Sequence, residues 1–416
     1  MRLLKFTIEG IRNYSKNHVS MDLYASDRVS MQSTSVHRFD GAGKNICSQR
    51  LVGIAGLNAS GKTTTLRALS MVLDVVRGVG LDANHLIYGP LTSILKNEFS
   101  IQAVLEDDEQ WYLLKSNLII EREHDAINDG DPLVSGKEFR FTTEYLWKHK
   151  NNLHKNELIS YEKFQNNSEL ISTRNVNNSK RELSDDSKKY LPRNMSLISG
   201  ALKRDRNLVS NTIPVFYYVD SLRLPFATPS VPPAVVRTFD PNVEQLKVDD
   251  NGKVHLKFAN DATERIIGQF DATQLLSVGT VRGSRIMNSA ISALSSGGYF
   301  LIDEIENSLN KKLVEMIMDL FVSPKTNPNG ALLVFTTHYP ELLDHLERKD
   351  NVYFTLRDSQ WNIKLVKYAD KVTRGELKKS EIFFSNLVIG TAPKAKDLSA
   401  LREYVRKTVT VGGANA

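Results

Sequence analysis

The stretch that most constrains the fold of this chain lies between residues 56 and 63. It satisfies the pattern G-x-x-x-x-G-K-[ST] and reads Gly56-Leu57-Asn58-Ala59-Ser60-Gly61-Lys62-Thr63. The apolar run RLVGIAG ends at its first glycine, and the following segment, TTLRALSMVLDVVRGV, places apolar residues at helical spacing. A strand, a glycine-rich loop and a helix in this order predict a loop whose backbone N–H groups surround phosphate oxygens.

The residue types in this loop suit a bound nucleotide and a magnesium ion. We expect Lys62 to reach the β and γ phosphates of ATP, and Thr63 to hold Mg²⁺. The alternative is an ordinary glycine-rich turn that starts a helix. The residues expected to bind the nucleotide are Gly56, Asn58, Ala59, Ser60, Gly61, Lys62, Thr63 and Thr64.

A second motif is the run YFLIDE, residues 299–304, in which an apolar strand ends in two carboxylates. Strands of a parallel sheet are buried on both faces, so acidic groups are expected only at the end that meets the ligand crevice. We expect Asp303 to bind Mg²⁺ and Glu304 to act as the base that polarises the attacking water. The alternative is an acidic N-cap for the next helix.

A third motif is LVFTTH, residues 333–338, another apolar strand, which ends in a histidine. A lone histidine is more often structural than functional. Its place at the end of the strand after the Asp-Glu strand would nevertheless bring His338 to the same crevice. There an imidazole could orient or sense the γ-phosphate, so His338 joins Lys62 and Glu304 as an expected catalytic residue.

A fourth motif, LSVGT, lies ahead of a predicted helix, and its Gly279 comes 24 residues before Asp303. Ser277 and Gly279 at a helix start offer a hydroxyl and free amides to an anion. Alone this is a common helix cap. In sequence order with the other three motifs it indicates a further nucleotide contact.

The periodicity predicts an α/β fold. From residue 286 the chain alternates between helix and strand, through MNSAISALSS, YFLIDE, NKKLVEMIMDLF, ALLVFTTH and PELLDHL. That alternation indicates a parallel or mixed central sheet with crossover helices. Antiparallel strands are expected within residues 1–24, and hairpins in NEFSIQAVLEDDEQWYLLKSNLIIERE and VEQLKVDDNGKVHLKF.

Residues 145–195 differ from the rest in being rich in Asn, Lys, Ser and Glu. We expect a polar, partly helical insertion that projects from the core, with a sparse apolar stripe at Leu158, Tyr161, Phe164 and Leu170. The expected division of the chain is an N-terminal half of the head, the insertion and a C-terminal half, at 1–144, 145–195 and 196–416.

The composition fits a soluble protein of the cytoplasm. The single cysteine, Cys47, excludes an internal disulfide and a Cys-built zinc site. Glu9 interrupts the N-terminal apolar stretch, and no apolar run reaches the roughly 18 residues of a membrane span, so no membrane partner is expected. A net charge of +6 permits contact with nucleic acid but also fits a mixed solvated surface.

The order of the four motifs resembles the head of an ABC-type AAA ATPase of the SMC, RecF and OLD class. Within that class, the chain is similar to the RloA-like and OLD-like ATPases often encoded in phage-defence loci. The segments that carry this closer resemblance are NASGKT, FDPNVEQLKV, LSVGTVRG, IDEIENSLN, NVYFTLRD and VIGTAPKAKD. The resemblance covers about residues 1–130 and 210–395.

The resemblance implies that Ser277 and Gly279 contact the γ-phosphate held on the phosphate loop of a second subunit. Two heads would then close around two ATP molecules in a homodimer or larger homo-oligomer. Residues 308–310, Ser-Leu-Asn, stand where the family has a loop that crosses this interface. Their alternative is an ordinary first helical turn.

Differences from the motifs of other ATPases narrow the kind of ATPase that this chain resembles. Transporter ATPases have LSGGQ where this chain has LSVGT. The nearest candidate for their switch glutamine is Gln102, and the alternative of an ordinary strand residue is favoured for it. Too few residues follow His338 for the nuclease domain of OLD nucleases. The sensor and arginine-finger motifs of AAA+ rings cannot be placed.

Three functions remain open at this level. The first is an ATP-hydrolysing switch that controls a separate effector protein, with a role in phage defence implied by resemblance alone. The second is a repair or structural ATPase that clamps DNA, although residues 145–195 lack the sustained heptads of a coiled-coil arm. The third is an assembly scaffold that binds ATP and turns it over slowly.

Overall fold

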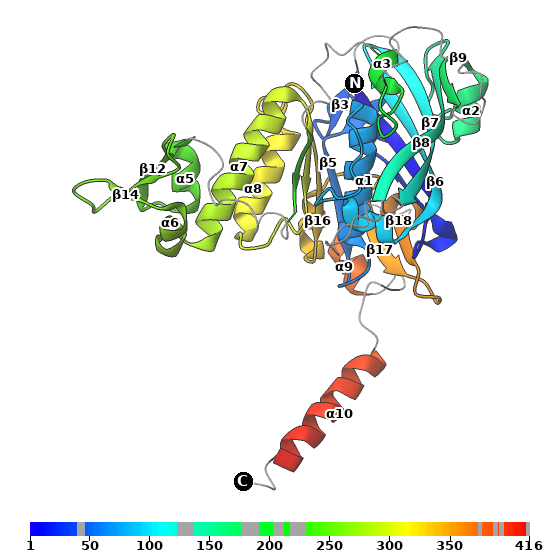
Figure 1. Cartoon of the computed structure of the whole chain (residues 1–416). Helices are drawn as coiled ribbons and strands as arrows, with labels where there is room; N and C mark the ends of the chain where they lie inside the picture. The colour runs from blue at the N-terminus through cyan, green and yellow to red at the C-terminus, as the bar shows by residue number, and fades with distance from the viewer. Residues whose placement is uncertain are drawn as a thin grey trace, which may run out of the picture.

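The computed structural model describes residues 1–39, 46–122, 137–175, 191–202, 212–216, 230–372, 377–385, 390 and 395–412. Two six-stranded sheets form most of the molecule, with the helix after the phosphate loop between them (Figure 1). Residues 230–267 form a smaller, four-stranded sheet.

The central sheet is parallel except at one edge. Its strands, in spatial order, are β10 (Thr212–Val215), β15 (Tyr299–Ile302), β16 (Leu332–Thr337), β5 (Leu51–Gly56), β17 (Val352–Arg357) and β18 (Ile363–Lys367). Only β18 runs antiparallel to its neighbour. Every residue of β5, β15 and β16 is buried, as expected for strands covered on both faces. The predicted α/β fold with its parallel sheet is confirmed.

Alternate residues of these strands enter two different cores. On one face, Val52 and Ile54 of β5 pack with α1 (Lys62–Arg77) and with the antiparallel sheet. On the other face, Leu51 and Ala55 pack with α7 (Val278–Ser296) and α8 (Lys311–Val322). Figure 1 shows α7 and α8 on the side of the sheet opposite α1. The central sheet is therefore rigidly held, and its loops project from a fixed base.

The antiparallel sheet confirms the hairpins predicted from the first third of the chain. Its strands in order are β2 (His18–Asp22), β1 (Arg2–Ile11), β6 (Leu95–Asp107), β7 (Gln110–Arg122), β8 (Lys137–His149) and β9 (Ser168–Asn175). Asp108 and Glu109 form the tight turn between β6 and β7, both with positive φ. Gln102 lies within β6, where its register partners are Thr7 and Lys115.

The polar segment 145–195 does not project from the core in its described part. It contains one short helix, α2 (Tyr161–Asn166), and the edge strand β9. Leu158 and Phe164 are buried against the antiparallel sheet, whereas Leu170 is exposed. The expectation of a projecting insertion is wrong for these residues, because even a sparse apolar stripe suffices to pack a segment on a sheet. Strand β8 also continues across residues 144 and 145, and the division of the chain into three parts stays a prediction. Residues 176–190 lie outside the described part.

The four-stranded sheet precedes α7 in the sequence. It consists of β11 (Ser230–Val231), β12 (Val243–Val248), β13 (Val254–Phe258) and β14 (Arg265–Ile267), accompanied by α5 (Pro233–Phe239) and α6 (Gln269–Leu275). The predicted hairpin corresponds to β12 and β13, whose turn contains Gly252 at a φ of 74°. This unit leads directly into Ser277 and the first turn of α7 (Figure 1).

The remaining elements are short, apart from the last helix. They are η1 (Ser15–Asn17), β3 (Val36–Arg38), β4 (Cys47–Gln49), η3 (Gly89–Ser93), α3 (Ile198–Ala201), η5 (Pro340–His345), η6 (Tyr368–Asp370), α9 (Lys379–Phe384) and α10 (Ala395–Gly412). The segment PELLDHL, predicted as a helix, forms the 3₁₀ helix η5. Within the described residues, no helix has both the length and the apolar character needed to cross a bilayer.

Candidate functional site

The predicted phosphate loop joins the C-terminal end of β5 to the N-terminus of α1. Gly61, the residue before the helix, has a φ of 103°, a conformation that side chains disfavour, and a Cβ there would lie 2.7 Å from Ile363. At Gly56 a Cβ would collide with the hydroxyl of Thr355. Close packing therefore requires both glycines of the motif, and at Gly61 the positive φ adds a second reason.

Lys62 lies in the first turn of α1 and is directed back over the loop. Its ammonium group donates to the carbonyls of Gly56 at 2.8 Å and Leu57 at 3.1 Å. Desolvation lowers the pKa of this lysine, while the nearby carboxylates of Asp303, Glu304 and Glu306 act in the opposite direction. A buried ammonium group held by carbonyls, in the field of three carboxylates, is placed to receive an anionic ligand.

The next residue, Thr63, meets the end of β15. Its hydroxyl donates to the carboxylate of Asp303, with distances of 3.1 Å to Oδ1 and 2.9 Å to Oδ2. A second hydroxyl, that of Thr336 at the end of β16, donates to Oδ1 at 2.7 Å. Asp303 is only 6% exposed, and burial raises the pKa of its carboxyl, because desolvation outweighs the two hydroxyl donors.

These groups also fit a magnesium ion. Mg²⁺ prefers hard oxygen ligands and is usually held by one or two protein oxygens together with phosphates and water. The Thr63 hydroxyl and the Asp303 carboxylate are oxygen donors in direct contact at the phosphate loop. The pair predicted from the sequence to hold the metal is thus brought together by the fold.

Glu304 occupies a strained position. Its φ is 51°, in the left-handed region that a residue other than glycine seldom adopts. The backbone there is held from both sides: its N–H donates to the Thr336 hydroxyl at 2.8 Å, and its carbonyl accepts from Arg282 of α7 at 3.0 Å. Such strain, of order 1 to 3 kcal/mol, persists only where the surroundings impose it, and it is frequent at functional sites.

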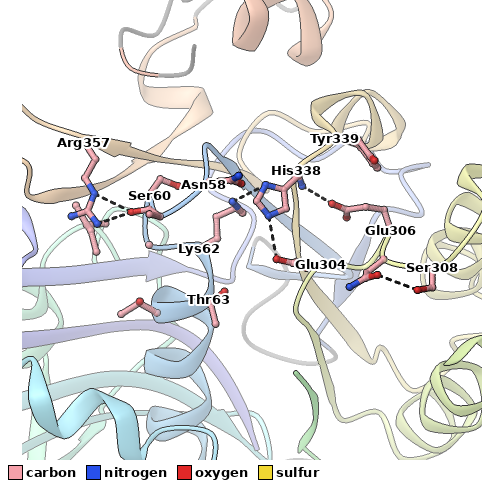
Figure 2. Close-up of a pocket in the computed structure, with 15 residues that line it drawn as sticks. Asn58, Ser60, Lys62, Thr63, Glu304, Glu306, Ser308, His338, Tyr339 and Arg357 are labelled. Carbon is pink, nitrogen blue, oxygen red and sulfur yellow. Dashed lines mark hydrogen bonds and ion pairs between the residues drawn. The ribbon is translucent and has the colours of Figure 1, made fainter. Parts of the chain in front are cut away.

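His338 connects the lysine to the glutamate. Its Nδ1 lies 3.3 Å from the Lys62 ammonium, and its Nε2 lies 3.2 Å from Glu304 Oε1 (Figure 2). Because an ammonium group can only donate, Nδ1 accepts, and the ring hydrogen is assigned to Nε2, which donates to Glu304. The three residues predicted to be catalytic therefore form one continuous chain of hydrogen bonds.

The phosphate loop and this chain of hydrogen bonds border one cavity of about 980 Å³. Its wall includes every predicted loop residue from Asn58 to Thr64, together with Glu304 and His338. The lining residues that sequence reasoning did not single out as ligands are Glu306, Asn307, Ser308, Tyr339, Arg357 and Ile363. The volume accommodates a nucleotide-sized ligand.

Ser277 and Gly279 do not line this cavity. Ser277 is the N-cap of α7, and its hydroxyl accepts from the backbone N–H of Thr280 at 3.0 Å. Gly279 packs so closely on the loop after β15 that a Cβ would lie 2.7 Å from the carbonyl oxygen of Ser308. Within one chain Gly279 therefore packs on the loop that follows Asp303 and Glu304, and neither residue lines the cavity of the phosphate loop. Gln102 does not line the cavity either.

Several residues that shape the site were missed by sequence reasoning. The hydroxyl of Thr336 donates to the Asp303 carboxylate and accepts from the backbone N–H of Glu304. Arg282 donates to the Glu304 carbonyl. Arg357 donates to the Ala59 carbonyl through Nε at 3.1 Å and Nη2 at 2.6 Å. Their contacts join residues far apart in the sequence, and no local pattern indicates them. Glu306 was missed as well, because its contact is with the backbone N–H of His338, 32 residues further along the chain.

Three comparisons relate the chain to known proteins. A family model, AAA_21, described as "AAA domain, putative AbiEii toxin, Type IV TA system", matches residues 51–344, which is more than half of the chain. The matched span includes all the predicted site residues. Among solved structures, the chain is similar to an SMC head domain from Thermotoga maritima, at 10% identity and a TM-score of 0.39, over 88% of this chain and 99% of that one. No curated protein matches the chain.

Proposed function

Because the chain belongs to the AAA_21 family of AAA domains, we propose that it is an ATP-hydrolysing switch. ATP drives the association of two heads, hydrolysis releases them, and the cycle controls a separate effector protein. The observation that carries this proposal is the chain of hydrogen bonds from Lys62 through His338 to Glu304, which borders one cavity with Thr63, the hydrogen-bond partner of the buried Asp303.

The chemistry is the attack of water on the γ-phosphorus of ATP. Glu304 takes the proton of the water as its oxygen bonds to phosphorus, and the bond to the bridging oxygen breaks to leave ADP and inorganic phosphate. Lys62 leaves the loop carbonyls and stabilises the negative charge on the phosphates. Thr63 and Asp303 would hold Mg²⁺, which supplies further charge neutralisation. His338, which lies between Lys62 and Glu304, orients the base through its Nε2–H.

Association of two heads explains why Ser277 and Gly279 lie away from the cavity of their own chain. Next to them, Val278 is 69% exposed and Leu275 is 45% exposed. Apolar side chains exposed beside an anion-binding helix start are suited to burial against another molecule. We infer that these residues complete the nucleotide site of a second copy, so that ATP is enclosed between two chains.

The biological role proposed is anti-phage defence, with the effector as a separate protein. The family description names an AbiEii toxin of a type IV toxin–antitoxin system. The resemblance to RloA-like and OLD-like ATPases points in the same direction. The conserved chemistry of an ATPase head does not by itself choose a biological role, so this part rests on family membership and resemblance.

The test is the mass of the purified protein with and without ATP and Mg²⁺, for wild type and Glu304→Gln, with the product of a neighbouring gene co-expressed. We expect slow turnover and ATP-bound dimers in Glu304→Gln, with capture of the partner only in the nucleotide-bound state. Unchanged turnover in this variant would remove Glu304 from the role of base. A monomer at every nucleotide concentration would remove the shared site.

A second candidate function, the clamping of nucleic acid, is favoured by one observation. A second cavity of about 380 Å³ lies between β2 and β18. The acidic and basic residues that line it are Lys5, Lys16, His18, Asp22, Lys364, Lys367 and Asp370. The excess of lysine suits phosphate groups. If this function holds, affinity for a DNA duplex falls steeply with salt. Absence of binding at low salt would dismiss it.

A further inference from the structure

The loop between β15 and α8 presents two glutamates to the cavity. Glu304 and Glu306 both line it, whereas Ile305 between them is fully buried in the core. The backbone N–H of Ile305 donates to the carbonyl of Thr336 at 3.1 Å, which ties this loop to the end of β16. Residues 304–307 form a turn, closed by a hydrogen bond from the backbone N–H of Asn307 to the carbonyl of Glu304 at 3.0 Å, and both glutamate side chains contact His338 just after β16.

Glu306 has a specific contact at that end. Its Oε1 accepts a hydrogen bond from the backbone N–H of His338 at 2.6 Å (Figure 2). Because His338 Nε2 also donates to Glu304, a closed ring of contacts joins the two glutamates and the histidine. The main chain and the side chain of His338 are held by two residues of the same loop.

The second carboxylate oxygen of Glu306 lowers the stability of the folded state. Oε2 is buried and has no hydrogen-bond partner among the described residues. A buried carboxylate oxygen without a partner disfavours the folded state, and the neutral amide of glutamine could accept the same N–H. Fold stability alone therefore gives no reason for a carboxylate at this position. Its charge also faces Lys62, whose ammonium form it favours.

We propose that Glu306 is a positioning residue for hydrolysis, which acts by fixing His338 between the base Glu304 and the γ-phosphate. This inference rests on the proposed ATPase function. Without the Oε1 contact, the His338 N–H is unpaired and the end of β16 can shift relative to the loop of Glu304. The imidazole then loses the alignment with Glu304 that the ring of contacts imposes, whereas the phosphate loop, on separate elements, is unaffected.

The experiment compares Glu306→Ala with Glu306→Gln in the full chain, using steady-state ATP turnover and the binding of a fluorescent, non-hydrolysable ATP analogue. We expect Glu306→Ala to lower kcat by roughly 10- to 100-fold, as misplacement of a catalytic group does, with analogue affinity nearly unchanged. Glu306→Gln keeps an acceptor for the His338 N–H and should retain most of the turnover. The matched control, Glu341→Ala, removes an exposed glutamate from η5 near the same strand end and should have no effect.

A double-mutant cycle with His338→Ala separates positioning from a general structural role. The alanine variant keeps its backbone N–H, so only the imidazole is lost. We expect Glu306→Ala to reduce kcat far less in the His338→Ala background than in wild type, because both changes act on one group. Equal reductions in the two backgrounds would overturn the proposal, as would wild-type turnover in Glu306→Ala.

A variant that fails to fold leaves the proposal testable. If Glu306→Ala does not fold, Glu306→Gln and the shorter Glu306→Asp decide the question, since only the amide keeps the full reach to His338. Turnover in the Gln variant as low as in the Asp variant would overturn positioning through this contact.

Failure of this inference and failure of the proposed function give different results. If Glu304→Gln abolishes turnover and the Glu306 variants do not affect it, this inference alone fails. If the wild-type protein shows no turnover, the proposed function fails and this inference with it.

Discussion

Thr336 donates its hydroxyl hydrogen to Asp303 Oδ1 at 2.7 Å across the neighbouring ends of β16 and β15. The hydroxyl oxygen of Thr336 in turn accepts a hydrogen bond from the backbone N–H of Glu304 at 2.8 Å. A single buried hydroxyl therefore orients the carboxylate that would hold the metal and also supports the strained backbone of Glu304, the proposed base. Its position two residues before His338 places all three groups at one edge of the sheet.

We predict that Thr336→Val lowers ATP turnover by about 10-fold and the free energy of unfolding by roughly 1 to 3 kcal/mol, because it leaves the Glu304 N–H without a partner. Valine has nearly the shape of threonine, so the change tests the hydroxyl alone. Thr336→Ser keeps the hydroxyl and is the control. Kinetics and denaturant unfolding of the two variants check this, and equal behaviour of Val and Ser would contradict it.

Lys62→Met should abolish the stabilisation of the protein by ATP. The side chain keeps a similar length but loses the charge that the phosphates require, so we expect at least about a 10-fold loss of affinity. The measurement is the rise in melting temperature on adding ATP and Mg²⁺, which follows ligand concentration over Kd. Lys16→Met, an exposed lysine outside the nucleotide cavity, is the control. A wild-type thermal shift in Lys62→Met would show that nucleotide binds elsewhere.

Asp303→Asn should stabilise the protein in the absence of nucleotide and metal while it abolishes hydrolysis. Burial raises the pKa of the Asp303 carboxyl, so the folded protein binds its proton more tightly than the unfolded chain does. The carboxyl therefore costs no stability below its unfolded pKa, and this cost appears as the pH rises through its folded pKa. At neutral pH we expect a gain on the order of 1 kcal/mol from the neutral amide, as found when strained active sites are relaxed.

The check is the melting temperature of wild type and Asp303→Asn in EDTA at neutral and at acidic pH. The difference between the two proteins should shrink as the pH falls and the wild-type carboxyl takes up its proton. A constant difference at all pH values would mean that the gain comes from packing and not from the charge.

Gly279→Ala should weaken association of the heads and leave ATP binding intact. The added methyl group would press on the Ser308 carbonyl oxygen at 2.7 Å, so the start of α7 or the loop after β15 must shift. The phosphate loop lies on other elements and keeps its geometry. Analogue binding and mass measurements with ATP test the two properties separately. An unchanged ATP-dependent mass would show that the contact of Gly279 with Ser308 has no part in association.

The sequence by itself determined the elements whose signals are local. The strand, loop and helix around Lys62, the apolar strands ending at Asp303 and His338, and the hairpin of β6 and β7 all follow from periodicity, glycine placement and turn residues. The sequence also predicted that Asp303 and His338 lie at one edge of the sheet, because parallel strands that alternate with helices bring their carboxyl ends to one side of a sheet.

Other features depended on contacts between distant segments. The packing of Leu158 and Phe164 on the antiparallel sheet was not evident in a polar stretch, because a few apolar side chains are decisive only when a sheet face is available to them. The roles of Arg282 and Thr336 likewise come from hydrogen bonds between separate elements. Local sequence patterns indicate which side chains are present and on which face of a helix or strand they lie. Only the tertiary structure decided which of them meet, since burial and hydrogen bonding depend on neighbours that the chain supplies from elsewhere.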